Sequence, residues 1–597
     1  METRGLRQVK VSLWFGLTVL ALSQACAFAQ TTVTTSSSAT PVPPVANPCP
    51  RFKAGSIVHN PPALFSSNGV LNVRFSYQRR FATDGTELLC FMTPDGLEDP
   101  TLHVKPGDHL IITVTNNTPA QPLTMMLNPP NCGATRMGNS SLNIHYHGTN
   151  TSPTCHQDEV IKTIINSGET FQYNVAFPTN EPSGLYWYHP HVHGIAEHAL
   201  QGGASGAIVV DGIENLQPAV SGLRHRILMV RDQPVPLNPS PTDNIPSWDV
   251  TLNYIPITSP TNPNSDNFVP AILPMEPGEK QFWRVSNSSS DTILDLQYVF
   301  DGVPQTMELV AVDGVPLNSQ DGSQQGRLIP VTHFMLPTAS RVEFIVSAPP
   351  SSVHLARLMT LRINTGPFGD NDPQRPLATI QLTGDADPYG GNDNKVGTFA
   401  AVSTTQQRFA GLVSAPVAVR RTVFFDEIQP SQFFMVVEGH PEHVFDPNRA
   451  PDIVATQGTV EEWIVQNRTP ENHEFHFHQL HFLVESQNNF ELSGSRQAPA
   501  ITGQYLDMIQ VPFWDQNPKH PFPSVTLRID FRGNDIGDFV FHCHILGHED
   551  LGMMNIIRVQ RSLVSANSGR STNSNSSTNT GRPVPASTEG SGKMKMN

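Results

Sequence analysis

The sequence predicts an all-β protein built from three related domains. Gly and Pro interrupt the chain throughout, with 42 and 53 residues among 597. The apolar segments between them are short, alternating and rich in β-branched side chains, which is typical of strands. Long apolar patterns with a helical period are scarce. One pattern occurs three times, and a chain of this length has room for three or four domains.

The repeated pattern indicates the number and order of the domains. Residues 104–116 read VKPGDHLIITVTN, residues 275–287 read MEPGEKQFWRVSN and residues 455–467 read ATQGTVEEWIVQN. Each copy has a Gly, a strand and a closing Asn at equal offsets. A second pattern links only the outer copies, as GLYWYHPH at 184–191 and GDFVFHCH at 537–544. The middle domain lacks this His-x-His strand, so we expect it to be a spacer or a wall of the substrate approach.

The repeats and the low-complexity segments give the domain boundaries. We expect domains at residues 56–212, 213–384 and 416–562, with one linker at 30–55 before the first domain and another at 385–415 between the second and the third. Residues 563–597 are rich in Ser, Asn, Gly and Thr, which is typical of a disordered tail. The strand candidates inside the domains include Leu110–Val114, Ala207–Val210, Val342–Val346 and Asn555–Val559.

Residues 1–29 are typical of a secretory signal peptide. Arg4 and Lys10 precede an apolar run at Val11–Leu22, and cleavage is expected near Ala29. The run is too short for a stable membrane span, and no later stretch reaches about 18 uninterrupted apolar residues. We therefore expect a secreted or periplasmic protein without a membrane span. The net charge of -15 argues against nucleic acid and anionic lipid as partners.

Four of the five cysteines that follow the signal peptide form an even set. In an oxidising compartment we expect disulfides among Cys49, Cys90, Cys132 and Cys155. The pairing of Cys132 with Cys155 is preferred because both lie in one loop-rich stretch, although three connectivities are open. Cys543 is the odd cysteine.

Ten histidines and Cys543 form four motifs with the spacing of metal ligands. Two histidines with one residue between them can diverge at a strand end and bind different metals of a compact cluster. Four such pairs supply eight imidazoles, which is enough for three copper ions. Two His, one Cys and a weak Met instead favour a single electron-transfer copper. The motifs are His145-x-His147, His189-x-His191, His473-x-x-His476-x-His478, and His542-Cys543-His544-x-x-x-His548 followed by Met553.

These motifs resemble those of the multicopper oxidase family, which includes laccases, bilirubin oxidases, ascorbate oxidase and metallo-oxidases. The resemblance covers the mature chain except its linkers and tail, and it implies three consecutive cupredoxin-like Greek-key β-sandwich domains. It also implies four copper ions, one of type 1, one of type 2 and two of type 3. The implied ligands are His473, Cys543, His548 and axial Met553 for type 1, His145 and His476 for type 2, His147, His189 and His544 for one type 3 copper, and His191, His478 and His542 for the other.

Some residues near the motifs depart from the family pattern or have two interpretations. The family usually has Gly-His directly after the third motif, but here His481 falls one residue late and its role is open. We expect His193 and His198 to be neighbouring or exposed imidazoles and not ligands. The resemblance places proton-relay carboxylates at Asp158 and Glu549, and the alternative for each is an ordinary solvated acid.

The motifs and the resemblance predict an enzyme that couples four one-electron oxidations to the reduction of dioxygen to two waters. Axial Met553 implies a low or middling type 1 potential, which favours phenols and aromatic amines as donors. Methionines are scattered, without the Met-rich insertion expected for cuprous ion. Ferrous or manganous ion would need carboxylates near His473, and Glu474 is adjacent in sequence, although adjacency does not require its side chain to face the copper.

Two alternative functions lie outside this class of oxidases. A copper nitrite reductase would have the type 1 ligands but would not need eight histidines in four pairs. A periplasmic copper store would need only the type 1 set or scattered ligands.

Overall fold

The computed structural model describes residues 39–234, 245–257, 267–318, 326–383, 408–493 and 499–562. The predicted signal peptide at 1–29, most of the predicted linker at 385–415 and the predicted tail at 563–597 lie outside these residues. Within the described part, no helix has the length and apolar composition of a membrane span.

The repeated sequence pattern forms the same structural unit three times. Its copies are the strands β5 (His109–Asn116), β18 (Lys280–Asn287) and β31 (Val460–Asn467). Each lies between one parallel and one antiparallel neighbour. The parallel neighbours are β2 (Val70–Phe81), β14 (Arg224–Pro234) and β28 (Val417–Ile428), and the antiparallel neighbours are β11 (Thr170–Ala176), β25 (Arg341–Ser347) and β36 (Ser524–Asp530).

The closing Asn of each repeat has the same structural role. Asn116, Asn287 and Asn467 are fully buried. The side-chain amide of Asn287 donates to the carbonyl oxygens of Thr292, Leu336 and Pro337 at 2.9–3.0 Å. Asn116 and Asn467 each donate to two backbone carbonyls in the same way. A buried carbonyl without a donor is costly, so the Asn holds the loops that follow the strand in place.

The first pair of sheets, here called the first sandwich, spans residues 63–210. One sheet has the order β1-β4-β13-β12-β9 and the other β11-β5-β2-β3. The rings of Phe75 and Phe91 on the second sheet pack against Tyr188 on the first. The new strands are β1 (Ala63–Phe65), β3 (Glu87–Met92), β4 (Thr101–Val104), β9 (His145–His147), β12 (Gly184–His189) and β13 (Gly206–Val210).

The middle sandwich spans residues 224–382. Its sheets have the orders β16-β15-β14-β18-β25-β21-β22 and β17-β27-β26-β19-β20, with β23 and β24 added at β21 and β19. Trp283 packs against Tyr298 between the two sheets. The new strands are β15 (Trp248–Leu252), β16 (Ile255–Ile257), β17 (Ala271–Met275), β19 (Leu294–Phe300), β20 (Val303–Pro304), β21 (Met307–Val312), β22 (Val315–Pro316), β23 (Ile329–Val331), β24 (Phe334–Leu336), β26 (Ala356–Thr360) and β27 (Arg375–Leu382).

The third sandwich spans residues 417–560. Its sheets have the orders β29-β28-β31-β36-β33-β34 and β30-β38-β37-β32-β35. Trp463 of the first sheet packs edge-on against Phe477 and Phe541 of the second. The new strands are β29 (Gln432–Val437), β30 (Ile453–Thr456), β32 (His473–Phe477), β33 (Phe482–Asn488), β34 (Tyr505–Leu506), β35 (Met508–Val511), β37 (Gly537–Cys543) and β38 (Met554–Gln560).

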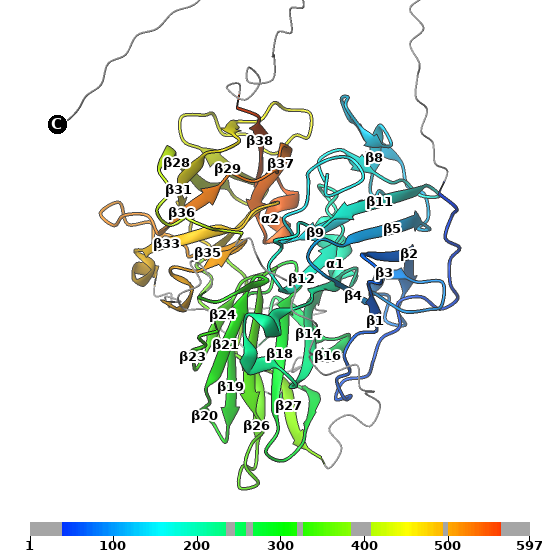
Figure 1. The fold of residues 1–597 in the computed structure, drawn as a ribbon, viewed down its shortest axis with the longest axis vertical. Helices are drawn as coiled ribbons and strands as arrows, with labels where there is room; N and C mark the ends of the chain where they lie inside the picture. The colour runs from blue at the N-terminus through cyan, green and yellow to red at the C-terminus, as the bar shows by residue number, and fades with distance from the viewer. Residues whose placement is uncertain are drawn as a thin grey trace, which may run out of the picture. The chain divides into compact units, whose positions relative to one another are not determined.

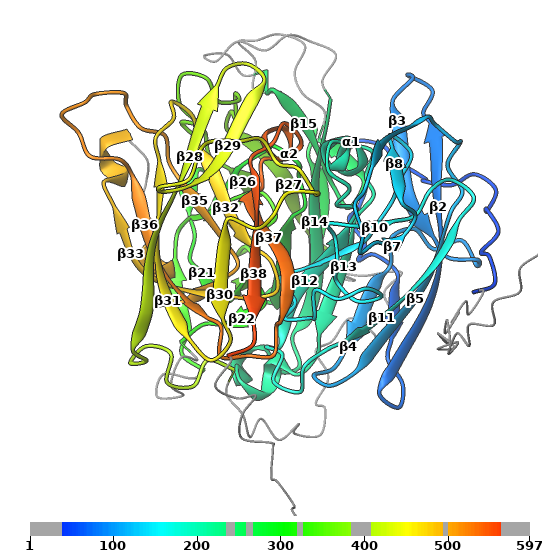
Figure 2. The same cartoon turned by 90° about the horizontal axis from the view of Figure 1, so that it is seen from above.

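The all-β prediction is confirmed, and the three sandwiches follow one another along the chain, from blue through green to orange (Figure 1). The strand candidates named from sequence lie in β5, β13, β25 and β38. Among the described residues, helix is limited to short segments, including α1 (Ala196–Gln201) and α2 (Leu546–Asp550), which contact each other. Figure 2 shows β12 of the first sandwich beside β37 of the third.

Two disulfides are present among the described residues. Cys132 bonds to Cys155, as preferred from sequence, and Cys49 bonds to Cys90. Cys543 is free and buried.

Candidate metal centre

Two pairs of strands bring the four His-x-His motifs together. In the first sandwich β12 pairs with β9, so that His189 lies opposite His145. In the third sandwich β32 pairs with β37, so that His476 lies opposite His542. We call the resulting group the eight-histidine cluster, and every member is at most 2% exposed. Its members are His145, His147, His189, His191, His476, His478, His542 and His544.

The rings of the two sandwiches interleave within this cluster. His145 stacks on His478 and His147 stacks on His476, each with ring centroids 3.9 Å apart. The Nε2 atom of His542 lies 3.2 Å from Nε2 of His191 and 3.1 Å from Nε2 of His478. Three ring nitrogens that converge in this way are arranged as ligands around one point. In other triplets of the cluster, one ring nitrogen from each histidine also lies within 4.8 Å of the other two.

The hydrogen bonds of the cluster leave one nitrogen of several rings free. Nδ1 of His145 bonds Asp158 at 2.9 Å, and Nδ1 of His189 and His476 bond backbone carbonyls at 2.8 and 2.9 Å. Their Nε2 atoms are buried without a hydrogen-bond partner. An imidazole held through one nitrogen with the other unsatisfied is the usual arrangement of a metal-binding histidine.

Burial also gives these rings the protonation state that a metal requires. It lowers the pKa of every imidazole in the cluster, and the neighbouring imidazoles lower most of them further. Neutral imidazoles have a lone pair available for a metal. Eight neutral, convergent imidazoles therefore fit copper, for which imidazole is a suitable ligand.

A second group, here called the thiolate site, forms at one end of β32 and β37. Nδ1 of His473 lies 3.1 Å from Nδ1 of His548, and Sγ of Cys543 lies 3.6 and 3.9 Å from these two atoms. His548 comes from α2, and its ring stacks on Phe433. Two imidazole nitrogens and one sulfur in a triangle match the ligand set of an electron-transfer copper.

The environment of the thiol supports this assignment. Burial raises the pKa of the Cys543 thiol, and a metal that binds the sulfur would have to displace its proton. The backbone N–H of Glu474 donates to Cys543 Sγ at 3.5 Å. Met553 is fully buried and is tied to the site by its backbone, which bonds both Cys543 and His548 at 3.0 Å.

The proposed proton-relay carboxylates are both buried. Asp158 accepts from Nδ1 of His145, from the backbone N–H of Tyr146 and from the side chain of Gln479. Glu549 is fully buried, and an oxygen of its carboxyl lies 3.6 Å from Nδ1 of His193. Burial raises the pKa of Glu549 to about 7. Neither Asp158 nor Glu549 is therefore an acid exposed to solvent.

The remaining histidines lie outside the converging groups. His481 is buried, and its Nε2 donates to the carbonyl of Asp313 at 2.9 Å. His193 approaches Glu549, whereas the side chain of His198 is 54% exposed and lies 3.7 Å from Glu87.

Sequence reasoning missed two carboxylates at the thiolate site. Glu471 lies 3.5 Å from Nε2 of His548, and Glu427 lies 3.7 Å from Nε2 of His473. Glu474, the acid noted from sequence, points elsewhere and accepts from the backbone of Thr338 at 2.7 Å. Glu471 is two residues before His473, and side chains two residues apart on an extended chain point to the same side. This spacing was the one signal in the sequence that could have placed Glu471 beside the site. Glu427 comes from β28, and nothing in the sequence links it to the site.

A cavity of about 500 Å³ opens beside His548, and we call it the acidic cavity. It lies between the middle and third sandwiches and α1, and six carboxylates line it. Burial raises the pKa of Asp372 to about 8 and that of Glu197 to about 7, and neighbouring carboxylates add to both shifts. The six are Glu197, Asp291, Asp370, Asp372, Glu471 and Asp550.

Comparisons with known proteins point to one family. Two family models described as multicopper oxidase match residues 135–215 and 426–562. Multicopper oxidase LPR1 homolog 1 of Oryza sativa subsp. japonica is 21% identical over 77% of this chain and 82% of its own length. The laccase of Bacillus subtilis is 21% identical over 76% of this chain and 87% of its own length.

Solved structures show the same fold. The 2F4 variant of the McoA multicopper oxidase of Aquifex aeolicus superposes with a TM-score of 0.61, at 17% identity over 85% of this chain and 100% of that one. A multicopper oxidase of Campylobacter jejuni, described as a metallo-oxidase, gives a TM-score of 0.58 at 20% identity, over 86% and 96% of the two chains. The fold is thus a series of cupredoxin-like β-sandwich domains, as expected.

The hydrogen bond from His145 to Asp158 yields a prediction about copper affinity. Asp158→Ala removes the acceptor that keeps Nε2 of His145 free for a metal, so copper affinity is expected to fall about 10- to 100-fold. Asp158→Asn keeps an oxygen that accepts from Nδ1 and should lose much less. Copper retained after dialysis against graded chelator measures both variants, and equal retention by wild type and Asp158→Ala would contradict the role of Asp158.

Proposed function

Because the chain belongs to the multicopper oxidase family, we propose that it takes single electrons from a small donor at the thiolate site and reduces dioxygen to two waters at the eight-histidine cluster. The observation that carries this proposal is the covalent sequence His542-Cys543-His544. Cys543 belongs to the thiolate site, and the residue on each side of it belongs to the cluster. The two groups are therefore joined by one short segment of backbone.

The donor atoms support four copper ions per chain. We assign type 1 copper to the thiolate site with Met553, and type 2 copper to His145 and His476. Support for one type 3 site comes from the converging Nε2 atoms of His191, His478 and His542. The other type 3 site is assigned to His147, His189 and His544. When bound, copper supplies reversible one-electron chemistry and a place for dioxygen to bind.

The protein's own groups orient the histidine rings, exclude water and supply protons. The buried cluster excludes bulk water, and Asp158 holds the Nδ1 proton of His145 so that its ring keeps one orientation. Reduction of dioxygen consumes protons, and we propose that Glu549 and Asp158 pass them inward. The approach of the Glu549 carboxyl to His193 supports a path from the side of α1.

For the electron donor we propose a divalent metal cation such as manganous or ferrous ion. Such a donor needs carboxylates beside the thiolate site, and these are Glu427 near His473 and Glu471 near His548. Acids from α1, α2 and two segments of the middle sandwich add to the wall of the acidic cavity. Oxygen ligands are what manganous ion prefers. Where these carboxyls are ionised, their like charges concentrate cations and repel anions. This favours a cation over the phenol that the sequence alone suggested.

Phenols and aromatic amines are the second candidate, and a different part of the same cavity favours them. Trp248, Phe368, Phe433 and Leu551 also line it. Phe368 is 59% exposed and Leu551 44% exposed, which offers an aromatic ring an apolar contact at the mouth. The volume of about 500 Å³ is in the range of small-molecule sites.

We also propose that the protein is exported, and the support for this comes from its disulfides. Two disulfides among the described residues require an oxidising compartment, which is the periplasm or the outside of the cell.

Oxygen uptake by the copper-loaded protein separates the two donor classes. With Mn²⁺ and 2,6-dimethoxyphenol in parallel cells, we expect uptake with Mn²⁺. Asp370→Asn keeps the oxygen that accepts from Trp248 but removes a charge from the cavity, so it should raise KM for Mn²⁺ about tenfold and leave that for the phenol nearly unchanged. Asp95→Asn removes an exposed charge outside the cavity and serves as the control. Uptake with the phenol alone would reject the metal donor.

The acidic cavity also predicts a dependence on pH. Carboxyls whose pKa is raised, such as Asp372 at about 8 and Glu197 at about 7, are mostly protonated at pH 6 and mostly or partly charged at pH 8. The cation site therefore gains negative charge as pH rises, although Arg375 beside Asp372 offsets part of it. KM for Mn²⁺ is expected to fall several-fold between pH 6 and pH 8. A KM that rises over this range in steady-state assays would contradict the prediction.

A further inference from the structure

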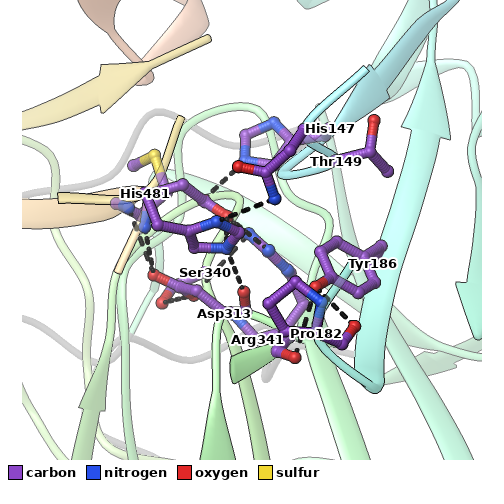
Figure 3. Close-up of polar contacts among 12 residues, drawn as sticks. His147, Thr149, Pro182, Tyr186, Asp313, Ser340, Arg341 and His481 are labelled. Atoms are coloured by element: carbon purple, nitrogen blue, oxygen red, sulfur yellow. Dashed lines mark hydrogen bonds and ion pairs between the residues drawn. The ribbon is translucent and has the colours of Figure 1, made fainter. Parts of the chain in front are cut away.

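The middle sandwich supplies none of the ten histidines, yet one of its charged side chains, Arg341, reaches the surroundings of the eight-histidine cluster. Arg341, the first residue of β25, is fully buried. Its guanidinium donates to both oxygens of Asp507, from Nη1 to Oδ1 at 2.7 Å and from Nη2 to Oδ2 at 2.5 Å. Figure 3 shows Arg341 among Asp313, Ser340, Tyr186 and His147. A two-pronged pair of this kind fixes the plane of the carboxylate as well as its position.

Asp507 in turn holds two histidines of the cluster. It lies between β34 and β35, and its Oδ1 accepts from Nε2 of His147 at 3.2 Å. Its backbone carbonyl accepts from Nδ1 of His476 at 2.9 Å. These two bonds leave Nδ1 of His147 and Nε2 of His476 buried without a hydrogen-bond partner and free for a metal. Asp507 thus selects which nitrogen each ring presents to the cluster.

The middle sandwich anchors Asp507 at both its side chain and its backbone. Arg341 holds the carboxylate, while Oδ2 of Asp313 accepts from the backbone N–H of Asp507 at 3.3 Å and of Met508 at 3.1 Å. Oδ1 of Asp313 accepts from the backbone N–H of Arg341 at 2.9 Å, which joins the two anchors. His481, one residue late against the family pattern, completes the surroundings at 3.5 Å from Asp507 Oδ2.

Gly148, the residue after His147, leaves room for the ion pair between Arg341 and Asp507. Gly148 has a φ of +83°, and a Cβ atom there would lie 2.2 Å from Nη2 of Arg341 and 2.5 Å from Oδ2 of Asp507. Any larger residue would force the guanidinium and the carboxylate apart. The His147-Gly148 motif and Arg341 are therefore matched across two sandwiches.

We propose that Arg341 is a positioning residue for the eight-histidine cluster, acting through Asp507 on the orientation of His147 and His476. This inference rests on the proposed function only for its effect on turnover. A buried ion pair is weak evidence for stability because desolvation offsets its attraction. The specific orientation of two metal-binding rings is a role that a plain apolar contact could not fill.

The test compares Arg341→Lys with Arg226→Lys in the copper-loaded protein. Lysine keeps the charge but lacks the planar fork, so it cannot hold both oxygens of Asp507. Arg226 is an equally buried arginine of the middle sandwich that bonds Gln281 and the carbonyl of Pro274, away from the histidines. The readouts are the electron paramagnetic resonance spectrum of bound Cu(II), oxygen turnover, and KM for the donor.

For Arg341→Lys we expect an altered Cu(II) spectrum of the histidine-bound copper, an unchanged thiolate-bound signal, and turnover lower by about 10- to 100-fold with KM for the donor unchanged. Arg226→Lys should change the melting temperature without changing the spectrum. If Arg341→Lys also changes only the melting temperature, the residue is a structural link and the proposal is overturned.

Gly148→Ala gives an independent test that leaves Arg341 in place. Its methyl group should separate Arg341 from Asp507 and change the same histidine-bound signal, and an unchanged spectrum would overturn the proposal even if Arg341→Lys does not fold. A wild-type protein that binds copper but takes up no oxygen would reject the proposed function, whereas the spectral effect of Arg341→Lys would still support the positioning role.

Discussion

The structure depends on the burial of eight neutral imidazoles whose free nitrogens converge. Each buried polar atom without a partner costs about 1–3 kcal/mol, and the cluster has several such atoms. A packed core would not retain them unless a ligand satisfied them, which bound copper would do. Because half of the rings come from the first sandwich and half from the third, the relative position of these two sandwiches sets the metal geometry. Residues far from the histidines are therefore constrained by them.

The middle sandwich meets this constraint from two sides. At the cluster, Arg341 and Asp313 hold Asp507, and Glu343 accepts from the backbone N–H of Leu185 on β12 at 2.8 Å. At the thiolate site, Asp291 and the segment around Asp372 form part of the acidic cavity. The sequence offered two roles for this domain, as a spacer or as a wall of the substrate approach. The cavity lining agrees with the second role. The contacts with Asp507 add a third role, the positioning of residues at the cluster, which the sequence did not suggest.

Local patterns predicted the fold class, the repeated strands, the Cys132–Cys155 disulfide and the histidines that come together. They succeed because strand alternation and ligand spacing are encoded over a few residues. The acidic cavity could not be predicted, since Glu197, Asp291, Asp372 and Glu471 come from distant segments. The role of Asp507 was also hidden, because it depends on a backbone carbonyl and on an arginine 166 positions away in sequence. The role of His481 was open from the sequence, and in the structure its Nε2 donates to the carbonyl of Asp313 in the middle sandwich.

Copper stoichiometry tests the central claim most directly. We expect four copper ions per wild-type chain by elemental analysis, and three in Cys543→Ser with the thiolate-to-copper absorption lost and the histidine-bound copper retained. Cys543 is buried at the thiolate site and contributes no atom to the eight-histidine cluster, so the two groups should load independently. A single copper per wild-type chain, lost entirely in Cys543→Ser, would contradict the cluster and the oxygen chemistry assigned to it.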